Sequence, residues 1–241
     1  MAISARQSYK QQATHISLFH ENLTRMTDIT RWWWVRHAPV VGFDGRFYGG
    51  ADVDCDVSDT ASFDNLASWL PKDAVWITSH LKRAHETADA LISAGIVPEE
   101  RLEDPDIGEQ QYGEWEGITY RELAERQLEA ANGGPWHKFW LAPADHRAPG
   151  GGESFIDVID RVSSVMLRVS ESHKGRDIVA VSHGGAIRAA LAYTLEIDPD
   201  KALCLSVENL STTRMDHIRG PGIGGDWRVV FVNVRPRHRA D

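Results

Sequence analysis

The sequence predicts an α/β protein, a three-layer α/β/α sandwich around a mostly parallel central sheet. Three short runs of aromatic, aliphatic and β-branched residues, at 32–35, 74–78 and 177–182, have no polar face, which is typical of strands buried on both sides. Segments with helical spacing of apolar residues lie between them. Strands that alternate with helices favour a parallel sheet covered on both faces.

The first of these runs, at 32–35, ends in Arg36 and His37. In open α/β sheets ligands bind beyond the carboxyl ends of the strands, so both side chains are expected to face a site. A lone Arg-His pair at a strand end is nevertheless more often a surface ion pair or a structural histidine. The pair alone therefore does not establish chemistry.

The strand predicted at 177–182 ends in the same way, because His183 follows it directly. Gly184 comes next, in a diglycine that opens a helical pattern over 186–195. Two buried strands that each deliver a histidine to the same edge of a sheet favour a functional constellation over two unrelated surface residues.

The other elements are predicted from helical spacing, capping residues and glycine-rich turns. Helices are expected over 59–70, 80–94, 118–131 and 153–173, with a possible turn at 136–140 and further strands over 202–207, 212–218 and 227–234. Ser58 or Asp59 is expected to cap the first helix and Ser79 the second. A loop rich in Gly and Asp spans 39–59, and glycines exclude one continuous helix over 102–117.

Arg83 falls in the first turn of the helix predicted over 80–94. A helix N-terminus is already partly positive, so an arginine there is mildly unfavourable unless an anion lies against both. The alternative is a solvated arginine close to Glu86, and the residues alone leave both interpretations open.

Composition and charge exclude several classes of function. The chain has 241 residues, of which 42% are hydrophobic and 25% charged, and no run is long enough to span a bilayer. A net charge of -9 disfavours nucleic acid as a partner, although a few convergent arginines can still bind a small anion. The two cysteines do not have zinc-ligand spacing, and the sequence has no apolar signal segment. We therefore expect a cytoplasmic protein without a metal site and without a cofactor.

One domain is expected to span 29–234. Residues 1–28 are polar with scattered apolar positions and no period, so a poorly ordered extension is expected, with Met26 as the natural start. A targeting peptide is the weaker interpretation of that segment. Residues 235–241 are expected to be a frayed tail.

Four motifs, in order along 29–234, resemble those of the histidine phosphatase superfamily, which includes phosphoglycerate mutases and alpha-ribazole phosphatases. RHA at 36–38 stands where the family has Arg-His-Gly, and SHLKRAHETA at 79–88 is similar to its Ser-Pro-Leu-x-Arg-Ala-x-Gln-Thr-Ala. The segment 109–117 resembles the one that carries the family's acid/base glutamate, and SHGG at 182–185 resembles the family's second histidine motif. The resemblance implies the phosphoglycerate mutase-like version of the fold.

The resemblance also implies a metal-independent phosphatase that acts on a small phosphorylated metabolite, with alpha-ribazole phosphate as a candidate substrate. His37 would attack phosphorus and form a phosphohistidine. Glu109 would protonate the leaving oxygen and later activate water. The implied catalytic residues are His37, Glu109 and His183, and the implied substrate-binding residues are Arg36, Arg83 and Gly184.

Two other functions stay open at this point. Mutase-type phosphoryl transfer would require that the protein retain a bisphosphorylated intermediate and exclude water; the segment 109–117 is closer to phosphatases. A non-catalytic phosphate-binding regulatory module would need neither a nucleophile nor an acid. Aromatic residues of the 39–59 loop and of 136–140 either cap the pocket or belong to local core: Phe43, Phe47, Tyr48, Trp136 and Trp140. The oligomeric state is not predicted.

Overall fold

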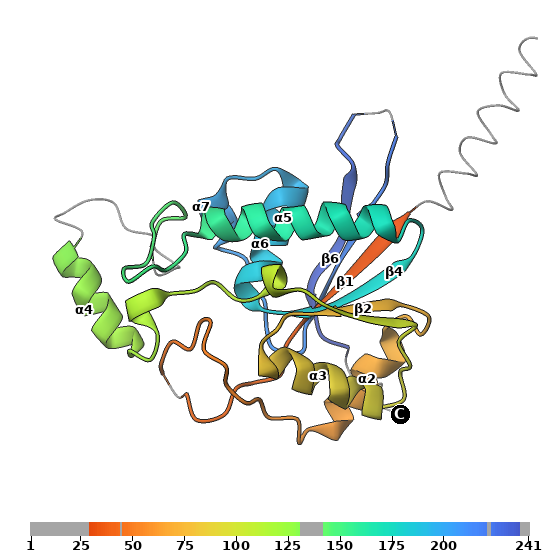
Figure 1. Ribbon diagram of the computed structural model, residues 1–241, viewed down its shortest axis with the longest axis horizontal. Helices are drawn as coiled ribbons and strands as arrows, with labels where there is room; N and C mark the ends of the chain where they lie inside the picture. Colours follow the sequence, from red (N-terminus) through yellow and green to blue (C-terminus); the bar gives the residue numbers. More distant parts are fainter. Residues whose placement is uncertain (1–28, 44, 131–141, 221–222, 237–241) are drawn as a thin grey trace, which may run out of the picture.

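A six-stranded sheet forms the centre of the molecule (Figure 1). The computed structural model describes residues 29–43, 45–130, 142–220 and 223–236, with the backbone alone for 126–130. In spatial order the strands are β3 (Glu100–Glu103), β2 (Val75–Thr78), β4 (Asp177–Ser182), β1 (Thr30–Arg36), β5 (Thr212–His217) and β6 (Trp227–Val234). The first four are mutually parallel, whereas β5 and β6 run antiparallel to their neighbours. The prediction of a mostly parallel sheet is confirmed.

Helices cover both faces of this sheet, which confirms the three-layer sandwich. Figure 1 shows α2 (Thr60–Trp69) and α3 (Lys82–Ser93) on one side, and α5 (Phe155–Ser172) and α6 (Gly184–Leu195) on the other. Two separate clusters of buried apolar side chains fill the spaces between the layers. The remaining helical segments are η1 (Pro105–Ile107), η2 (Gly113–Trp115), α4 (Tyr120–Ala130) and α7 (Pro199–Ala202).

The tryptophans of β1 explain why this strand has no polar face. Trp32 and Trp34 are fully buried, stack with ring centroids 5.3 Å apart, and belong to the core under α5 and α6. Trp33 and Val35 point the opposite way, into the core beside α2 and α3. The parallel register with β4 pairs Arg36 with Ser182, so the residue after each strand lies at the same edge.

Most of the predicted elements agree with the structure. Asp59 is the residue that caps α2, since its side chain accepts a hydrogen bond from the Ser62 N–H at 3.1 Å. Ser154 and Asp157 form a capping box at the start of α5. The 39–59 segment is a loop, and 102–117 is broken into two short 3-10 helices.

Two predictions about elements are wrong, and one strand was not predicted. No strand forms over 202–207, because Asp198 caps and Pro199 starts the short helix α7. The charged edge strand β3 was not predicted, since its sequence ERLE has no buried run. Ser79 does not occupy the N-cap position of α3, which belongs to Leu81; α3 therefore begins at Lys82, two residues later than expected.

Some predictions concern residues that the structure does not describe. The extension at 1–28, the turn at 136–140 and most of the tail at 235–241 lie outside the described residues. Within the described part, no helix combines the length and apolar character needed to cross a membrane.

Candidate active site

His37 follows β1 directly and is fully buried. Its ring Nδ1 lies 2.6 Å from its neighbour's carbonyl, Ala38 O. A carbonyl can only accept, so Nδ1 carries the proton and Nε2 carries a lone pair. Nε2 is buried and has no hydrogen-bond partner among the described residues.

The backbone around His37 is fixed from three other elements. The His37 N–H donates to Ser182 O at 2.9 Å, and Asn209 Nδ2 donates to the His37 carbonyl at 2.8 Å. The Ala38 N–H donates to Thr87 Oγ1 of α3 at 2.9 Å. The ring therefore has little conformational freedom left to lose when a ligand binds.

The His37 ring is held in its neutral form. Burial is the largest cause that lowers its pKa well below the usual 6.5, and the positive charges of Arg83 and Arg36 lower it further. The hydrogen bond to Ala38 O opposes this shift without cancelling it. A neutral imidazole with an unshared pair on Nε2 is the form that can act as a nucleophile.

His183 follows β4 and is equally buried, with its ring centroid 5.1 Å from that of His37. Arg83 Nε lies 3.2 Å from His183 Nδ1, and Ser79 Oγ lies 2.6 Å from Nε2. Because a guanidinium can only donate, Nδ1 accepts and Nε2–H donates to the serine. Burial, followed by the charge of Arg83, also lowers the pKa of His183 well below its usual range.

Arg83 is completely buried, so it is not a solvated arginine. It donates from Nη1 to Ala51 O and from Nη2 to Gly49 O, each at 2.7 Å, and its guanidinium lies 5.0 Å from the ring centroid of Tyr48. Glu86, the alternative partner, instead accepts the N–H of Cys55. Arg83 thus joins the 39–59 loop to His183 in the interior of the site.

Arg36 also contacts Tyr48, through the hydroxyl group rather than the ring. Its Nη1 donates to Val207 O at 2.6 Å and its Nη2 to the Tyr48 hydroxyl at 3.4 Å. Its Nε is buried without a hydrogen-bond partner within the described part of the chain. Tyr48 thus contacts both predicted phosphate-binding arginines, whereas Phe47, at 6% exposure, is local core.

The carboxylate of Glu109 lies against the N-terminus of α6. Its Oε1 accepts the N–H groups of Gln110 and Gly185, both at 3.0 Å. A Cβ at position 185 would meet that oxygen at 2.2 Å, so a side chain there would displace the Glu109 carboxylate. The charge of Glu109 acts on the pKa values of Arg83 and Arg188, which burial lowers and the carboxylate raises.

Arg161 of α5 holds the backbone of the Glu109 loop. It donates to Asp106 O and Gly108 O at 2.7 and 2.9 Å and to Glu109 O at 3.1 Å. Its Nε also pairs with Glu153 at 2.8 Å. Sequence reasoning missed Arg161 because it lies within the amphipathic helix between core positions.

The structure brings all six predicted residues to one edge of the sheet: Arg36, His37, Arg83, Glu109, His183 and Gly184. Sequence reasoning missed Arg188, which lies one turn after Gly184 on α6, and the contact between Ser79 and His183. The spacing of four from Gly184 is the signal that could have indicated Arg188. No group of three or more His, Cys, Asp or Glu side chains in the described ranges is placed to hold a metal ion.

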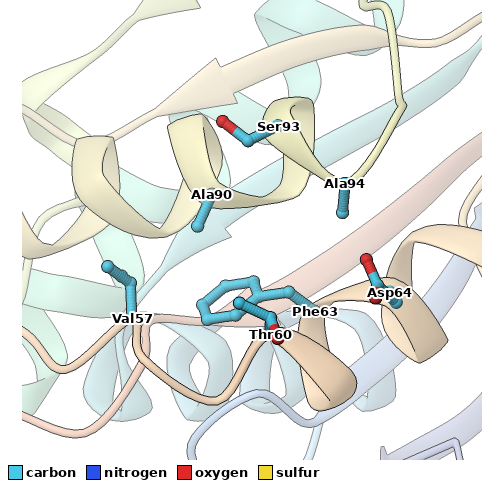
Figure 2. A pocket seen from close by; sticks show the side chains of 7 residues that line it. All are labelled: Val57, Thr60, Phe63, Asp64, Ala90, Ser93 and Ala94. Atoms are coloured by element: carbon cyan, nitrogen blue, oxygen red, sulfur yellow. The ribbon is translucent and has the colours of Figure 1, made fainter.

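A separate cavity of about 250 Å³ lies between α2 and α3 (Figure 2). The Phe63 ring lies between the two helices, with Ala90 and Ser93 on the facing helix. None of the six predicted residues lines it. It is therefore distinct from the candidate active site.

Fold and site together define an α/β protein with two buried, neutral histidines and two arginines at the carboxyl edge of its sheet. Comparison with known proteins gives its family, because residues 32–233 match the histidine phosphatase superfamily (branch 1). The chain therefore belongs to the histidine phosphatase superfamily, and it is an enzyme of the phosphatase type.

The similar proteins include several named phosphatases. A metal-independent phosphoserine phosphatase of Arabidopsis thaliana is 31% identical over 174 residues, which are 70% of each chain. An adenosylcobalamin/alpha-ribazole phosphatase of Escherichia coli is 29% identical over 209 residues, which are 85% of this chain and 91% of the relative. The solved structure of a mycobacterial glucosyl-3-phosphoglycerate phosphatase superposes with a TM-score of 0.66 at 25% identity, covering 85% of this chain and 99% of that one.

Proposed function

We propose that this protein hydrolyses a small phosphomonoester without a metal ion, through a phosphohistidine at His37. The observation that carries this proposal is the state of the His37 ring: buried and neutral, with Nδ1–H held by Ala38 O and with Nε2 lacking a partner among the described residues. Most buried side-chain nitrogens have a hydrogen-bond partner, and an open Nε2 on a neutral ring between two arginines fits a group that attacks phosphorus.

In the first step, His37 Nε2 attacks phosphorus while the bond to the leaving oxygen breaks. Arg36 and Arg83 stabilise negative charge on the equatorial oxygens, and the N-terminus of α6 at Gly184 adds its dipole. Glu109 transfers a proton to the leaving oxygen, so the product departs as a neutral alcohol.

In the second step, Glu109 acts in the opposite direction. As a carboxylate it removes a proton from water, the water oxygen attacks phosphorus, and the phosphorus–nitrogen bond breaks. Inorganic phosphate leaves, and His37 returns to its neutral form. Arg161 keeps Glu109 in one place for both steps because it binds the backbone of that loop.

The substrate we propose is a small phosphorylated metabolite of the cytoplasm, and alpha-ribazole phosphate is one candidate. The Escherichia coli relative named for that activity supports this choice, and so does the RHAP form of the first motif at 36–39. The phosphoserine phosphatase relative makes O-phosphoserine a second candidate to be tested beside it.

The test is phosphate release in the presence of EDTA from p-nitrophenyl phosphate, alpha-ribazole phosphate, O-phosphoserine and 3-phosphoglycerate. We expect release that disappears in His37→Ala. Isomerised phosphoglycerate without free phosphate would instead support the mutase function. Phosphate binding without turnover of any ester would support the non-catalytic module.

A further inference from the structure

The backbone segment 48–51 encloses the guanidinium of Arg83. Gly49 O accepts from Nη2 and Ala51 O from Nη1, each at 2.7 Å, and the ring centroid of Tyr48 lies 5.0 Å from the guanidinium carbon. The direction of a planar guanidinium is set by the acceptors that its N–H groups meet. The position of segment 48–51 therefore decides which way Arg83 presents its charge in the site.

The side chain of Glu116 holds the middle of this segment. Glu116 follows η2 directly and is partly buried, and its Oε1 accepts the Gly50 N–H at 2.8 Å and the Tyr112 N–H at 3.1 Å. Hydrogen bonds from backbone N–H groups to a carboxylate are stronger than those between neutral groups. Tyr112 comes three residues after Glu109. Glu116 thus joins segment 48–51 to the loop that carries the proposed acid/base group.

This contact leaves no room for side chains on the backbone that it holds. A Cβ at Gly49 would lie 2.7 Å from Glu116 Oε1 and 2.6 Å from Tyr112 Cδ2, and a Cβ at Gly50 would lie 3.3 Å from the same oxygen. Gly49 also has a φ of +41°, a conformation that favours glycine. The two glycines therefore let the carboxylate approach the backbone directly.

The Glu109 loop has supports that do not depend on Glu116. Arg161 donates to three of its carbonyl groups, including Glu109 O at 3.1 Å, and the Glu109 carboxylate accepts the Gly185 N–H at 3.0 Å. Loss of the Glu116 contact should therefore displace segment 48–51 more than it displaces Glu109. The expected consequence is a change in phosphate binding rather than in proton transfer.

We propose that Glu116 is a positioning residue for phosphate binding: it holds Gly50 in place and thereby fixes the carbonyl groups that direct Arg83 toward the phosphoryl group. The role requires an acceptor oxygen at the right reach rather than a negative charge, because an amide oxygen accepts backbone N–H groups as a carboxylate oxygen does. The inference rests on the proposed phosphatase function and adds to it a residue that acts through Arg83.

The test separates reach from charge with two variants. Glu116→Gln keeps an acceptor oxygen on a side chain of the same length, whereas Glu116→Asp keeps the charge on a side chain that is one carbon shorter. The substrate is p-nitrophenyl phosphate, and inorganic phosphate is the competitive inhibitor. We expect Glu116→Asp to weaken inhibition by phosphate and to raise KM, each at least about fivefold, with kcat lowered less than about threefold. Glu116→Gln should stay within about twofold of the wild type in all three quantities.

Glu122→Asp is the matched control. The Glu122 carboxylate also accepts a backbone N–H, that of Thr119 at 2.7 Å, but it lies at the start of α4 and not on segment 48–51. This variant should keep the wild-type KM and the wild-type inhibition by phosphate.

Two further variants test the same contact from the other side. Gly50→Ala places a Cβ against Glu116 Oε1 without changing any charge, and it should weaken phosphate inhibition about two- to threefold, even where Glu116→Asp does not fold. In an Arg83→Gln background, Glu116→Asp should weaken phosphate inhibition further by less than about twofold, because the guanidinium through which it acts is gone.

The outcomes separate the two proposals. If Gly50→Ala and a folded Glu116→Asp keep the wild-type inhibition by phosphate, or if Glu116→Gln loses as much as Glu116→Asp, the positioning role is overturned and the phosphatase function stands. A full further loss in the Arg83→Gln background also overturns it. If p-nitrophenyl phosphate and every other ester remain intact with the wild type, the proposed function itself fails.

Discussion

The two buried histidines at the sheet edge differ in how their rings are held. His37 has Nδ1 on Ala38 O and no partner for Nε2 among the described residues, whereas Arg83 and Ser79 occupy both ring nitrogens of His183. Both rings are fully buried and both pKa values are lowered. The two rings are equally buried and therefore differ in their hydrogen bonds alone: Nε2 of His37 has no partner among the described residues, and both nitrogens of His183 are bonded.

Helix α3 supports both arrangements from a single turn. Thr87 binds the backbone after His37, and Arg83 binds the ring of His183. Thr87 Oγ1 in turn donates to the carbonyl of Arg83 at 2.7 Å. The helix thus fixes the relative position of the two rings, and the contrast between them can be tested by changing one ring at a time.

The largest effect is expected from removing the ring with the lone pair. His37→Ala should lower kcat by at least about 10⁴-fold, because no other group can form the covalent intermediate, while His183→Ala should lower it only about 10²–10³-fold. Phosphate release from p-nitrophenyl phosphate measures both. An acid-labile phosphoryl label should be trapped on wild-type protein and absent from His37→Ala. Wild-type turnover in His37→Ala would contradict the assignment of roles.

The second largest effect on kcat is expected from Glu109→Gln. The amide can still accept the N–H of Gly185 but can neither give nor take the proton, so kcat should fall about 10²–10³-fold. Inhibition by inorganic phosphate should change by less than about threefold, because the arginines that bind phosphate are intact. A change confined to KM would instead assign Glu109 to substrate binding.

Ser79→Ala tests the contact that holds Nε2 of His183. Without the serine oxygen, His183 Nε2 loses its acceptor and the ring orientation is less well fixed, so kcat should fall about tenfold with KM little changed. Ser164→Ala removes an exposed serine that donates to Asp160 O within α5 and serves as the control. Equal rates for Ser79→Ala and the control would show that the contact with Ser79 does not position His183.

The edge of the sheet could be predicted from sequence because its signals are local. The strands before His37 and His183 have apolar centres without a polar face, and the residue that follows each strand lies at the carboxyl edge. The place of Arg83 at a helix start left an anion ligand and a solvated arginine both open, and the structure places the side chain beside His183 rather than in solvent. Each of these inferences needs only the period of one element and the direction of one strand.

The contacts that connect elements could not be predicted in this way. Arg161 and Glu109 are 52 residues apart, and Ser79 and His183 are 104 apart, so no local pattern joins them. The strand expected over 202–207 failed for a local reason instead: the side chain of Asp198 and the ring of Pro199 favour a helical turn just before it. The charged strand β3 pairs in parallel with β2, and its own sequence carries no buried run that would indicate a strand.

The smallest expected effect concerns the property that the two histidines share. In the unfolded chain each ring titrates near 6.5, whereas in the folded protein both pKa values are lowered, chiefly by burial. As the pH falls below about 6.5, the unfolded chain takes up protons that the folded protein refuses, so the free energy of unfolding decreases by up to about 1.4 kcal/mol per pH unit for each ring. Urea denaturation between about pH 7 and pH 5 should show this loss.

His37→Asn and His183→Asn should each reduce the pH dependence of the free energy of unfolding by a similar amount, although their effects on kcat differ widely. A wild-type stability that stays constant over this range would show that the two rings take up protons in the folded state, and the neutral His37 on which the nucleophilic role depends would then be lost.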